Sequence, residues 1–208
     1  MIICRTPYRI SFFGGGTDYP DWYLKNEGQV ISTTINRYSY ITCRYLPNFF
    51  PYKHRIRYYK REEVSDIADI QHPVVRACLE YKDINRGLDL VHHGDLPAMG
   101  GLGSSSSFTV GMLHALNALK GNYVSKEQLG RAALEIEQLI LKENVGSQDQ
   151  IAAAYGGLNH IKFNKNNNIT VQSINLSVER YKRIEDMCCL FFTGITRKAD
   201  ALACEQIN

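Results

Sequence analysis

The order of apolar and polar residues predicts β-strands over much of the chain. Residues 2–13 and 29–46 are rich in Ile, Val, Thr and Tyr, which favour strands, and three consecutive glycines from position 14 end the first segment. Shorter segments of similar character predict further strands, at residues 54–59, 87–93, 158–163 and 169–176. The chain is therefore expected to be rich in strands, and it contains no internal repeat or low-complexity linker.

Two amphipathic helices are predicted between these strands. Over residues 104–119, apolar side chains recur every three or four positions, as in a helix packed on a sheet: Phe108, Met112, Ala115, Leu116 and Leu119. Ser125 and Gln128 have the spacing of a capping box, which predicts that a second helix starts there and continues to about residue 141. Residues 72–81 show a shorter helical pattern.

A change in composition near residue 180 predicts a domain boundary. A charged stretch, residues 179–186, leads there into the apolar run 187–192. We expect residues 1–180 to form one domain and residues 181–208 to begin another, because about 25 residues cannot bury an independent core.

Charge and cysteine content narrow the range of partners. Twenty-four Lys and Arg against 21 Asp and Glu give a formal net charge of +3, too small to indicate a nucleic-acid or membrane partner. The basic cluster in residues 53–61 keeps nucleic-acid binding open as an alternative, although Glu62 and Glu63 follow it at once. The six cysteines have no C-x-x-C spacing, and no apolar run is long enough for a membrane span. We therefore expect reduced thiols and a cytoplasmic protein.

The segment 97–107 is the best candidate for a phosphate-binding loop. It joins a glycine-rich turn to four consecutive serines at the start of the predicted helix 104–119. Glycines let backbone N–H groups approach an anion closely, and the first turn of a helix presents unpaired donors and a positive dipole end. The serine hydroxyls add donors or an oxygen ligand for Mg²⁺. Taken alone, the segment would equally suit a glycine-rich turn with a serine N-cap.

Glu137 is predicted to face the protein interior. Its helical neighbours three and four positions away are all apolar: Ala133, Leu134, Ile140 and Leu141. A buried ionised carboxylate is costly unless it is paired, so we expect a metal ion or an arginine nearby. Glu135, by contrast, has Arg131 and Gln138 at these spacings and is expected at the surface. The alternative is that Glu137 lies at the edge of the apolar stripe and reaches solvent.

Two further segments combine glycine turns with charged residues. In residues 145–157, Asp149 follows a glycine turn and opens an alanine-rich stretch. It is either a helix N-cap or the group that orients, and deprotonates, a hydroxyl receiving a phosphoryl group. In residues 5–18, a predicted strand carries Arg9 into a triple-glycine turn that ends at Asp18. Short polar groups after a tight turn suit hydroxyl recognition, although an Asx-type turn has the same composition.

In this order, the segments resemble the signature motifs of the GHMP kinase superfamily, named after galactokinase, homoserine kinase, mevalonate kinase and phosphomevalonate kinase. Pro97 with residues 101–105 matches the family's Pro-x-x-x-Gly-Leu-Gly-Ser-Ser nucleotide loop, and the spacing from Glu137 to Asp149 matches as well. Within the superfamily, the chain looks most like the D-glycero-D-manno-heptose 7-phosphate kinases, on the basis of Arg9 and residues 14–18, 146–150, 155–157 and 193–199.

The resemblance implies an α+β fold in which a mixed sheet with a left-handed βαβ crossover packs on helices, followed by the start of a truncated C-terminal α+β domain. It implies a kinase that uses ATP and Mg²⁺ to phosphorylate a sugar or sugar phosphate, at the anomeric hydroxyl of the heptose 7-phosphate. The implied ATP-binding residues are Pro97, Gly100, Gly101, Leu102, Gly103, Ser104, Ser105 and Ser106. The implied substrate-binding residues are Gly15, Gly16, Thr17, Asp18 and Gln148. Catalysis is assigned to Asp149 and Arg9, and Mg²⁺ binding to Ser105 and Glu137.

The sequence departs from the family in one respect, because the third motif, a glycine-rich loop of the C-terminal domain, is absent. A catalytically impaired protein that binds sugar or nucleotide is therefore the first alternative, and a nucleic-acid-binding module using residues 53–61 is the second. Apolar segments such as 187–192 would lack their usual cover, so pairing with a second copy or with a complementing C-terminal chain is a further expectation. The expected partner is a small sugar or sugar phosphate, with no nucleic acid and no membrane.

Overall fold

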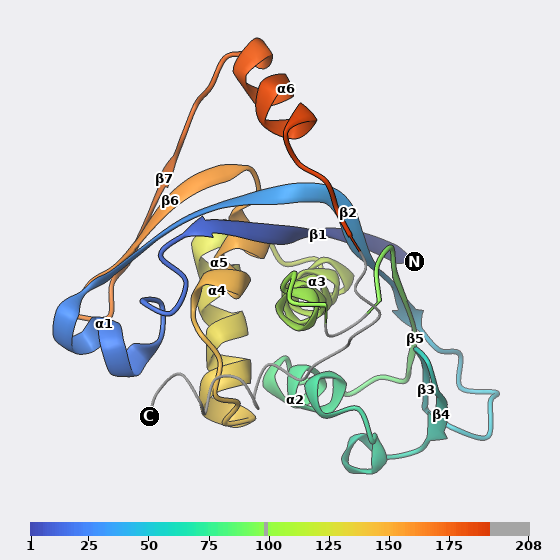
Figure 1. The fold of residues 1–208 in the computed structure, drawn as a ribbon. Helices are drawn as coiled ribbons and strands as arrows, with labels where there is room; N and C mark the ends of the chain where they lie inside the picture. Colours follow the sequence, from blue (N-terminus) through green and yellow to red (C-terminus); the bar gives the residue numbers. More distant parts are fainter. Residues whose placement is uncertain (98–99, 192–208) are drawn as a thin grey trace.

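The computed structural model describes residues 1–97 and 100–191, which form a seven-stranded sheet covered by helices (Figure 1). The strands are β1 (Ile2–Phe13), β2 (Gly28–Tyr45), β3 (His54–Arg57), β4 (Arg61–Val64), β5 (Leu88–Gly94), β6 (Leu158–Phe163) and β7 (Ile169–Ser173). The helices are α1 (Pro20–Asn26), α2 (Pro73–Tyr81), α3 (Ser104–Leu119), α4 (Lys126–Leu134), α5 (Gln148–Tyr155) and α6 (Val178–Asp186), with a 3₁₀ helix η1 (Ile67–Asp69) and a π-helix η2 (Glu135–Ile140). The fold is mixed α and β, as the sequence predicts.

Strand β2 is the centre of the sheet. It pairs antiparallel with β1 along most of its length, with β6 through residues 28–33 and with β5 through residues 39–45. Beyond these strands, β3 adds to β5 in parallel, β4 adds to β3, and β7 adds to β6. The parallel strands β3 and β5 are connected through β4 and α2, as a βαβ crossover requires. That this crossover is left-handed stays a prediction.

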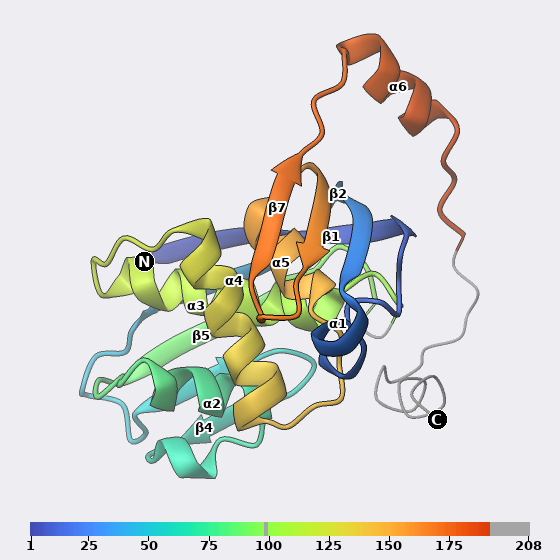
Figure 2. The ribbon, with the colours of Figure 1, turned by 90° about the vertical axis from the view of Figure 1, so that its left-hand side faces the viewer.

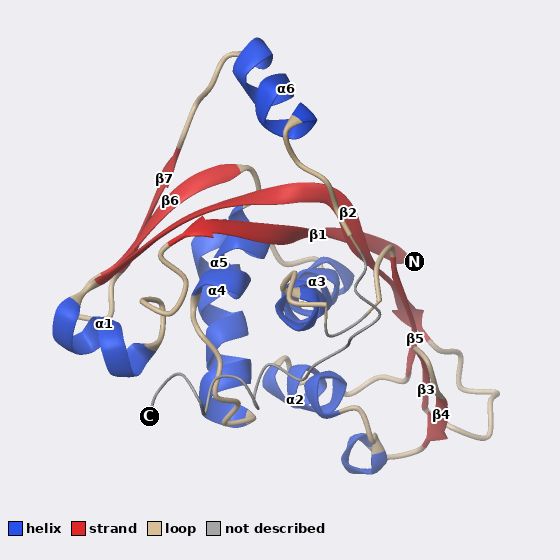
Figure 3. Ribbon diagram, in the orientation of Figure 1, coloured by secondary structure: helices blue, strands red, loops and turns tan. Residues whose placement is uncertain are grey.

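Helix α3 lies at the centre of the core, on the face of the sheet where α2, α4 and α5 also pack (Figure 3). Its apolar stripe is buried as predicted, with Met112, Ala115 and Leu116 at 0% exposure. These side chains pack with inward residues of β2 and β5, such as Ile41 and Leu90. Among the described residues, no helix is long and apolar enough to cross a membrane.

The long elements follow the sequence pattern more closely than the short ones. The strands 2–13 and 158–163 and the helix 104–119 have the predicted bounds. The pattern does not predict α1, β4 or α6, and the second predicted helix changes from α4 to the π-helix η2 at residue 135. Helix α6 lies apart from the sheet (Figure 2). It includes residue 180, and the predicted domain boundary at that residue stays a prediction. The motif 193–199 and most of the predicted second domain lie outside the described residues.

Candidate active site

The loop between β5 and α3 carries the residues predicted to bind ATP. Pro97 and Gly100 are exposed in this loop. Gly101 (φ +73°) and Gly103 (φ +71°) adopt the left-handed backbone conformation that favours glycine. Helix α3 begins at the next residue, so the positive end of its dipole and its first backbone N–H groups lie at the loop. This geometry is typical of a phosphate-binding loop.

Arg9 and Asp149, the predicted catalytic residues, form an ion pair beside this loop. Arg9 lies on β1 and Asp149 in the first turn of α5, and both Nε and Nη2 of Arg9 lie 2.6 Å from Oδ1 of Asp149. Arg9 also donates to the loop, from Nη1 to the Gly101 carbonyl at 3.0 Å and from its backbone N–H to the Leu102 carbonyl. A β-carbon at Gly103 would lie only 3.2 Å from Oδ2 of Asp149. The ion pair and the loop are therefore in direct contact.

Glu137, the predicted metal ligand on η2, is fully buried, as its apolar neighbours predict. Its Oε2 accepts hydrogen bonds from Oγ of Ser106 at 2.9 Å and from Nε2 of Gln150 at 2.5 Å. Burial disfavours the charged form and raises the pKa of Glu137 to about 7, although the hydrogen bonds from Gln150 and Ser106 partly offset this effect. The neighbours of the carboxylate are thus hydroxyl and amide groups, and no ion pair with an arginine occurs among the described residues.

The polar groups around Glu137 fit a magnesium ion. Mg²⁺ prefers oxygen ligands and is usually held by one or two carboxylates together with substrate phosphates. Oε1 of Glu137 and Oε1 of Gln150 are both buried without a hydrogen-bond partner among the described residues. Ser105, the second predicted ligand, is exposed in the first turn of α3 beside Ser106. The described residues contain no group of three or more His, Cys, Asp or Glu suited to a metal ion, but a site of one carboxylate with hydroxyl groups does not need one.

Asp18, which is predicted to bind substrate hydroxyls, joins the glycine turn after β1 to the start of α5. It is fully buried, and its two carboxylate oxygens accept hydrogen bonds from the backbone N–H groups of Gly16 and Gln148, both at 3.1 Å. A β-carbon at Gly146 would lie 2.0 Å from Oδ2 of Asp18, so the approach of the two segments requires glycine. Burial raises the pKa of Asp18, against the lowering effect of the backbone hydrogen bonds. These contacts position the turn, and binding of sugar hydroxyls by Asp18 stays a prediction.

The other predicted substrate residues lie in the same turn or next to it. The single proton of the Thr17 hydroxyl is shared between the Gly14 carbonyl at 2.8 Å and the Gln29 carbonyl at 3.1 Å, and its oxygen accepts from the Gln29 N–H. This hydroxyl therefore links the turn to β2. The side chain of Gln148 is buried, and its Oε1 has no hydrogen-bond partner among the described residues. A β-carbon at Gly15 would lie 3.9 Å from Nε2 of Gln148, which places this amide beside the glycine turn. Gln148 therefore has an acceptor available for a substrate hydroxyl.

The first turn of α3 brings the predicted catalytic pair and the predicted metal ligand together. Gly103 contacts the ion pair, and Ser106, three residues later and so within about one helical turn, contacts Glu137. Sequence reasoning did not assign a role to Gln150, which is fully buried against the same carboxylate. The positions three and four residues after Gln150 are alanines. Apolar neighbours on this side indicate an interior position for Gln150, although the preceding neighbours Ser147 and Gly146 do not.

Comparisons with known proteins agree with this geometry. Residues 71–157, which include the glycine-rich loop, match the family model of the GHMP kinases N terminal domain. The chain is 29% identical to the D-glycero-alpha-D-manno-heptose 7-phosphate kinase of Campylobacter jejuni subsp. jejuni, over 94% of this chain and 60% of that protein. It is 27% identical to the galactokinase of Chloroflexus aurantiacus, over 76% of this chain and 42% of that protein.

Solved structures of kinases are similar to this chain in fold. A D-glycero-D-manno-heptose 1-phosphate kinase from Bacteriodes thetaiotaomicron is similar with a TM-score of 0.79 and 25% identity, over 87% of this chain and 61% of that chain. A mevalonate kinase at 18% identity has a TM-score of 0.65 and shares the fold. The chain thus spans about 60% of the length of these two heptose kinases. Family match, fold and loop geometry agree, and over residues 71–157 this chain is similar to the GHMP kinases N terminal domain.

Proposed function

We propose that this chain is the nucleotide- and substrate-binding part of an ATP-dependent kinase that phosphorylates a sugar or sugar phosphate. The observation that carries the proposal is the Arg9–Asp149 ion pair in contact with the glycine-rich loop. Phosphoryl transfer depends on positioning and charge neutralisation more than on covalent catalysis. A cation and a carboxylate held at a phosphate-binding loop supply both.

The predicted loop, metal-binding and catalytic residues each have a role in this proposal. The loop from Pro97 and the first turn of α3, residues 104–106, hold the phosphates of ATP through backbone N–H groups and serine hydroxyls. Ser105 and Glu137 hold Mg²⁺, which when bound neutralises charge on the phosphates. Arg9 places positive charge where the transferred group sits, and Asp149 orients the acceptor hydroxyl and takes its proton.

The proposed acceptor is the anomeric hydroxyl of D-glycero-D-manno-heptose 7-phosphate. Support comes from the similarity to two heptose kinases, each covering most of this chain. The unpartnered carbonyl oxygen of Gln148, beside the turn that contains Gly15, Gly16 and Thr17, is the group that we propose to recognise a sugar hydroxyl. The similarity to galactokinases keeps the acceptor within the sugars.

Release of ADP by the purified chain tests this proposal. The assay contains Mg-ATP and heptose 7-phosphate, with galactose and fucose as comparison sugars. Asp149→Asn removes the proposed proton acceptor and should abolish turnover while the folded state is kept, as checked by circular dichroism. Asp69→Asn changes an exposed carboxylate outside the site and should leave turnover unchanged. Turnover that survives Asp149→Asn would remove Asp149 from the mechanism.

The same assay, together with a binding measurement, also tests a second candidate, a protein that binds sugar or nucleotide without turnover. A folded chain that binds Mg-ATP in calorimetry but releases no ADP would support this candidate. Release of ADP that depends on both sugar and Asp149 would exclude it.

Partners and location belong to the same proposal. Cys4, Cys43 and Cys78 are free thiols buried in the core, which suits the reducing cytoplasm. A second copy of the chain is the proposed macromolecular partner. Size-exclusion chromatography with light scattering distinguishes a monomer from a dimer.

A further inference from the structure

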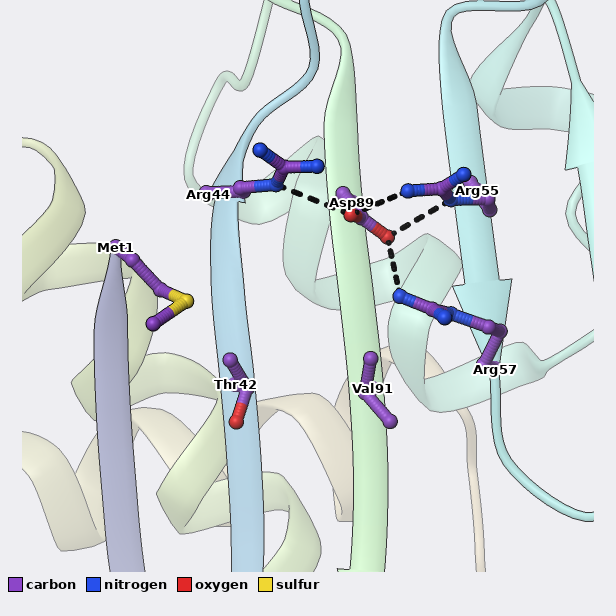
Figure 4. A pocket seen from close by; sticks show the side chains of 7 residues that line it. All are labelled: Met1, Thr42, Arg44, Arg55, Arg57, Asp89 and Val91. Atoms are coloured by element: carbon purple, nitrogen blue, oxygen red, sulfur yellow. Dashed lines mark hydrogen bonds and ion pairs between the residues drawn. The ribbon is translucent and has the colours of Figure 1, made fainter.

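Three arginines surround one carboxylate on the sheet surface (Figure 4). The carboxylate is Asp89 on β5, which is 5% exposed. Its oxygens accept four hydrogen bonds: from Arg55 Nε at 3.0 Å and Nη2 at 2.7 Å, from Arg44 Nε at 3.1 Å and from Arg57 Nη2 at 3.1 Å. A carboxylate offers about four lone-pair positions, so Asp89 can accept no further donor.

The alternation of side chains along the strands places this cluster on the face opposite α2 and α3. Ile56, which lies between Arg55 and Arg57 on β3, is 0% exposed and belongs to the core. Leu90, next to Asp89 on β5, is likewise 0% exposed in the core. Successive side chains of a strand point to opposite faces, so the arginines and Asp89 point away from the helices. The cluster is therefore separate from the candidate active site.

The arginines carry more positive charge than this carboxylate can balance. Three guanidinium cations share one anion, which leaves two positive charges in excess at the cluster. The neighbouring Arg61 and Glu63 pair with each other and change this balance little. Like charges held close together repel, and hydrogen bonds to a single carboxylate do not remove the excess. An ion pair that only linked neighbouring strands would need just one of these arginines.

Two of the arginines also keep hydrogen-bond donors that the described part of the chain does not use. Nε of Arg57 is buried without a hydrogen-bond partner among the described residues. Arg44 bonds Asp89 through Nε, and its side chain is 46% exposed. An unpaired buried donor is costly, so a ligand with several acceptor oxygens would stabilise this arrangement. Both arginines line a cavity of about 250 Å³, together with Thr42 and Val91.

We propose that this cavity binds a phosphate-type dianion, either free phosphate or the phosphate group of a small molecule, between Arg44 and Arg57. Two excess positive charges match a phosphate group, which carries a charge of about −1.5 to −2 near pH 7. Guanidinium groups bind phosphate oxygens with paired N–H donors, and Arg is better suited than Lys to this geometry. Asp89 holds the three guanidinium groups in place for the anion. This site goes beyond the proposed kinase function, because it lies outside the loop that would hold ATP.

Nuclear magnetic resonance of the arginine side chains tests the site directly in the full chain. Arg44→Lys and Arg57→Lys each remove one Nε–Hε resonance and so assign the two signals, and Arg9→Lys assigns a reporter on the glycine-rich loop. Inorganic phosphate is then titrated near pH 7 at constant ionic strength. The Arg44 and Arg57 signals should shift together and saturate, with a common dissociation constant of about 1 mM or tighter. Static signals, or an unsaturated drift equal to that caused by chloride, would overturn the proposal even if the Arg9 signal shifts.

Further arms of the experiment identify the source of the phosphate. In Arg44→Gln/Arg57→Gln, followed through the Nε–Hε signal of Arg55, which also lines the cavity, phosphate binding should weaken by at least about tenfold. Arg131→Gln, at an exposed arginine of α4, should not change it. Equal affinities for inorganic phosphate and glycerol 3-phosphate assign the site to free phosphate, and tighter binding of the ester assigns it to a phosphorylated small molecule. Tighter binding of a single-stranded oligonucleotide, at equal phosphate concentration, would overturn the proposal in favour of a nucleic-acid surface that includes residues 53–61.

Discussion

Single buried groups at the site should control how stability depends on pH. The pKa of Glu137 is raised from 4.5 to about 7, chiefly by burial. The folded chain therefore keeps a proton that the unfolded chain has already released, so the free energy of unfolding falls as pH rises between about 4.5 and 7. Glu137→Gln keeps the shape and cannot ionise. At each pH, the free energy of unfolding of the unchanged chain is subtracted from that of the variant. This difference should be about 3 kcal/mol larger at pH 8 than at pH 4.

Urea unfolding of both proteins across this pH range, with EDTA present to remove divalent metal, measures the effect. All other titrating groups are shared, so the difference between the two curves isolates Glu137. Parallel curves would mean that the carboxyl group ionises in the folded state as easily as in water. They would contradict the burial of Glu137 and weaken its assignment as a ligand for Mg²⁺.

Arg9 should be more sensitive to the shape of its side chain than to its charge. Three of its nitrogens are engaged: Nε and Nη2 with Asp149, and Nη1 with the Gly101 carbonyl. Arg9→Lys keeps the positive charge but has a single nitrogen, so it cannot hold the carboxylate and the loop together. If the proposed kinase activity is correct, kcat should fall on the order of 100-fold. Arg131→Lys, at an exposed arginine paired with Glu127, is the matched control, and an equal loss there would point to general destabilisation.

At the residue scale, the sequence predicts which residues form the site but not how they contact one another. Apolar neighbours identify Glu137 as an interior residue, and glycine turns mark Arg9 and Asp149. The donors to Glu137 come from α3 and α5, and only the packing of these helices brings Ser106 and Gln150 to the same oxygen. Contacts between distant segments depend on the tertiary fold, which helical spacing within one segment does not contain.

At the scale of elements, the π-helix η2 explains why one predicted helix behaves as two. The backbone N–H of Leu141 donates to the Ile136 carbonyl, five residues earlier, so the helix is locally wider than an α-helix. Glu137 lies within this widened turn, and π-bulges occur frequently at functional sites. A periodic apolar pattern has no distinct signature for a single π-turn, so the sequence predicts one continuous helix up to about residue 141.

The start of α4 offers a test of local stability. Ser125 and Gln128 form the predicted capping box, with Ser125 Oγ accepting from the Gln128 N–H and Gln128 Oε1 accepting from the Ser125 N–H. Ser125→Ala removes the first of these bonds and should lower the free energy of unfolding by about 1 kcal/mol. Ser177→Ala removes the corresponding cap of α6, a helix with no buried residue, and should leave global stability nearly unchanged. Chemical denaturation compares the two variants, and equal losses would mean that α6 folds together with the core.

At the scale of the whole molecule, the sequence predicts most strands and the central helix but not their order in the sheet. Strand β2 pairs with three others, and β3 adds to β5 in parallel through a crossover. Strand composition does not specify partners, and the resemblance to a known family implies a mixed sheet with a βαβ crossover but not this strand order. The short elements α1 and β4 gave too few residues for a periodic pattern to be recognised.

The distribution of burial predicts that the molecule opens unevenly. Helix α3 has eleven buried residues, whereas α6 has none, and Val178 and Tyr181 on α6 are exposed at 80% and 41%. Local opening is easiest where few apolar contacts hold an element. In hydrogen–deuterium exchange followed by mass spectrometry, amides of α6 should exchange fastest among the described helices, and those of α3 slowest. The opposite result would be slow exchange in α6 that becomes slower as protein concentration rises. It would mean that a second copy covers the helix and buries its exposed apolar side chains, and it would contradict the predicted order.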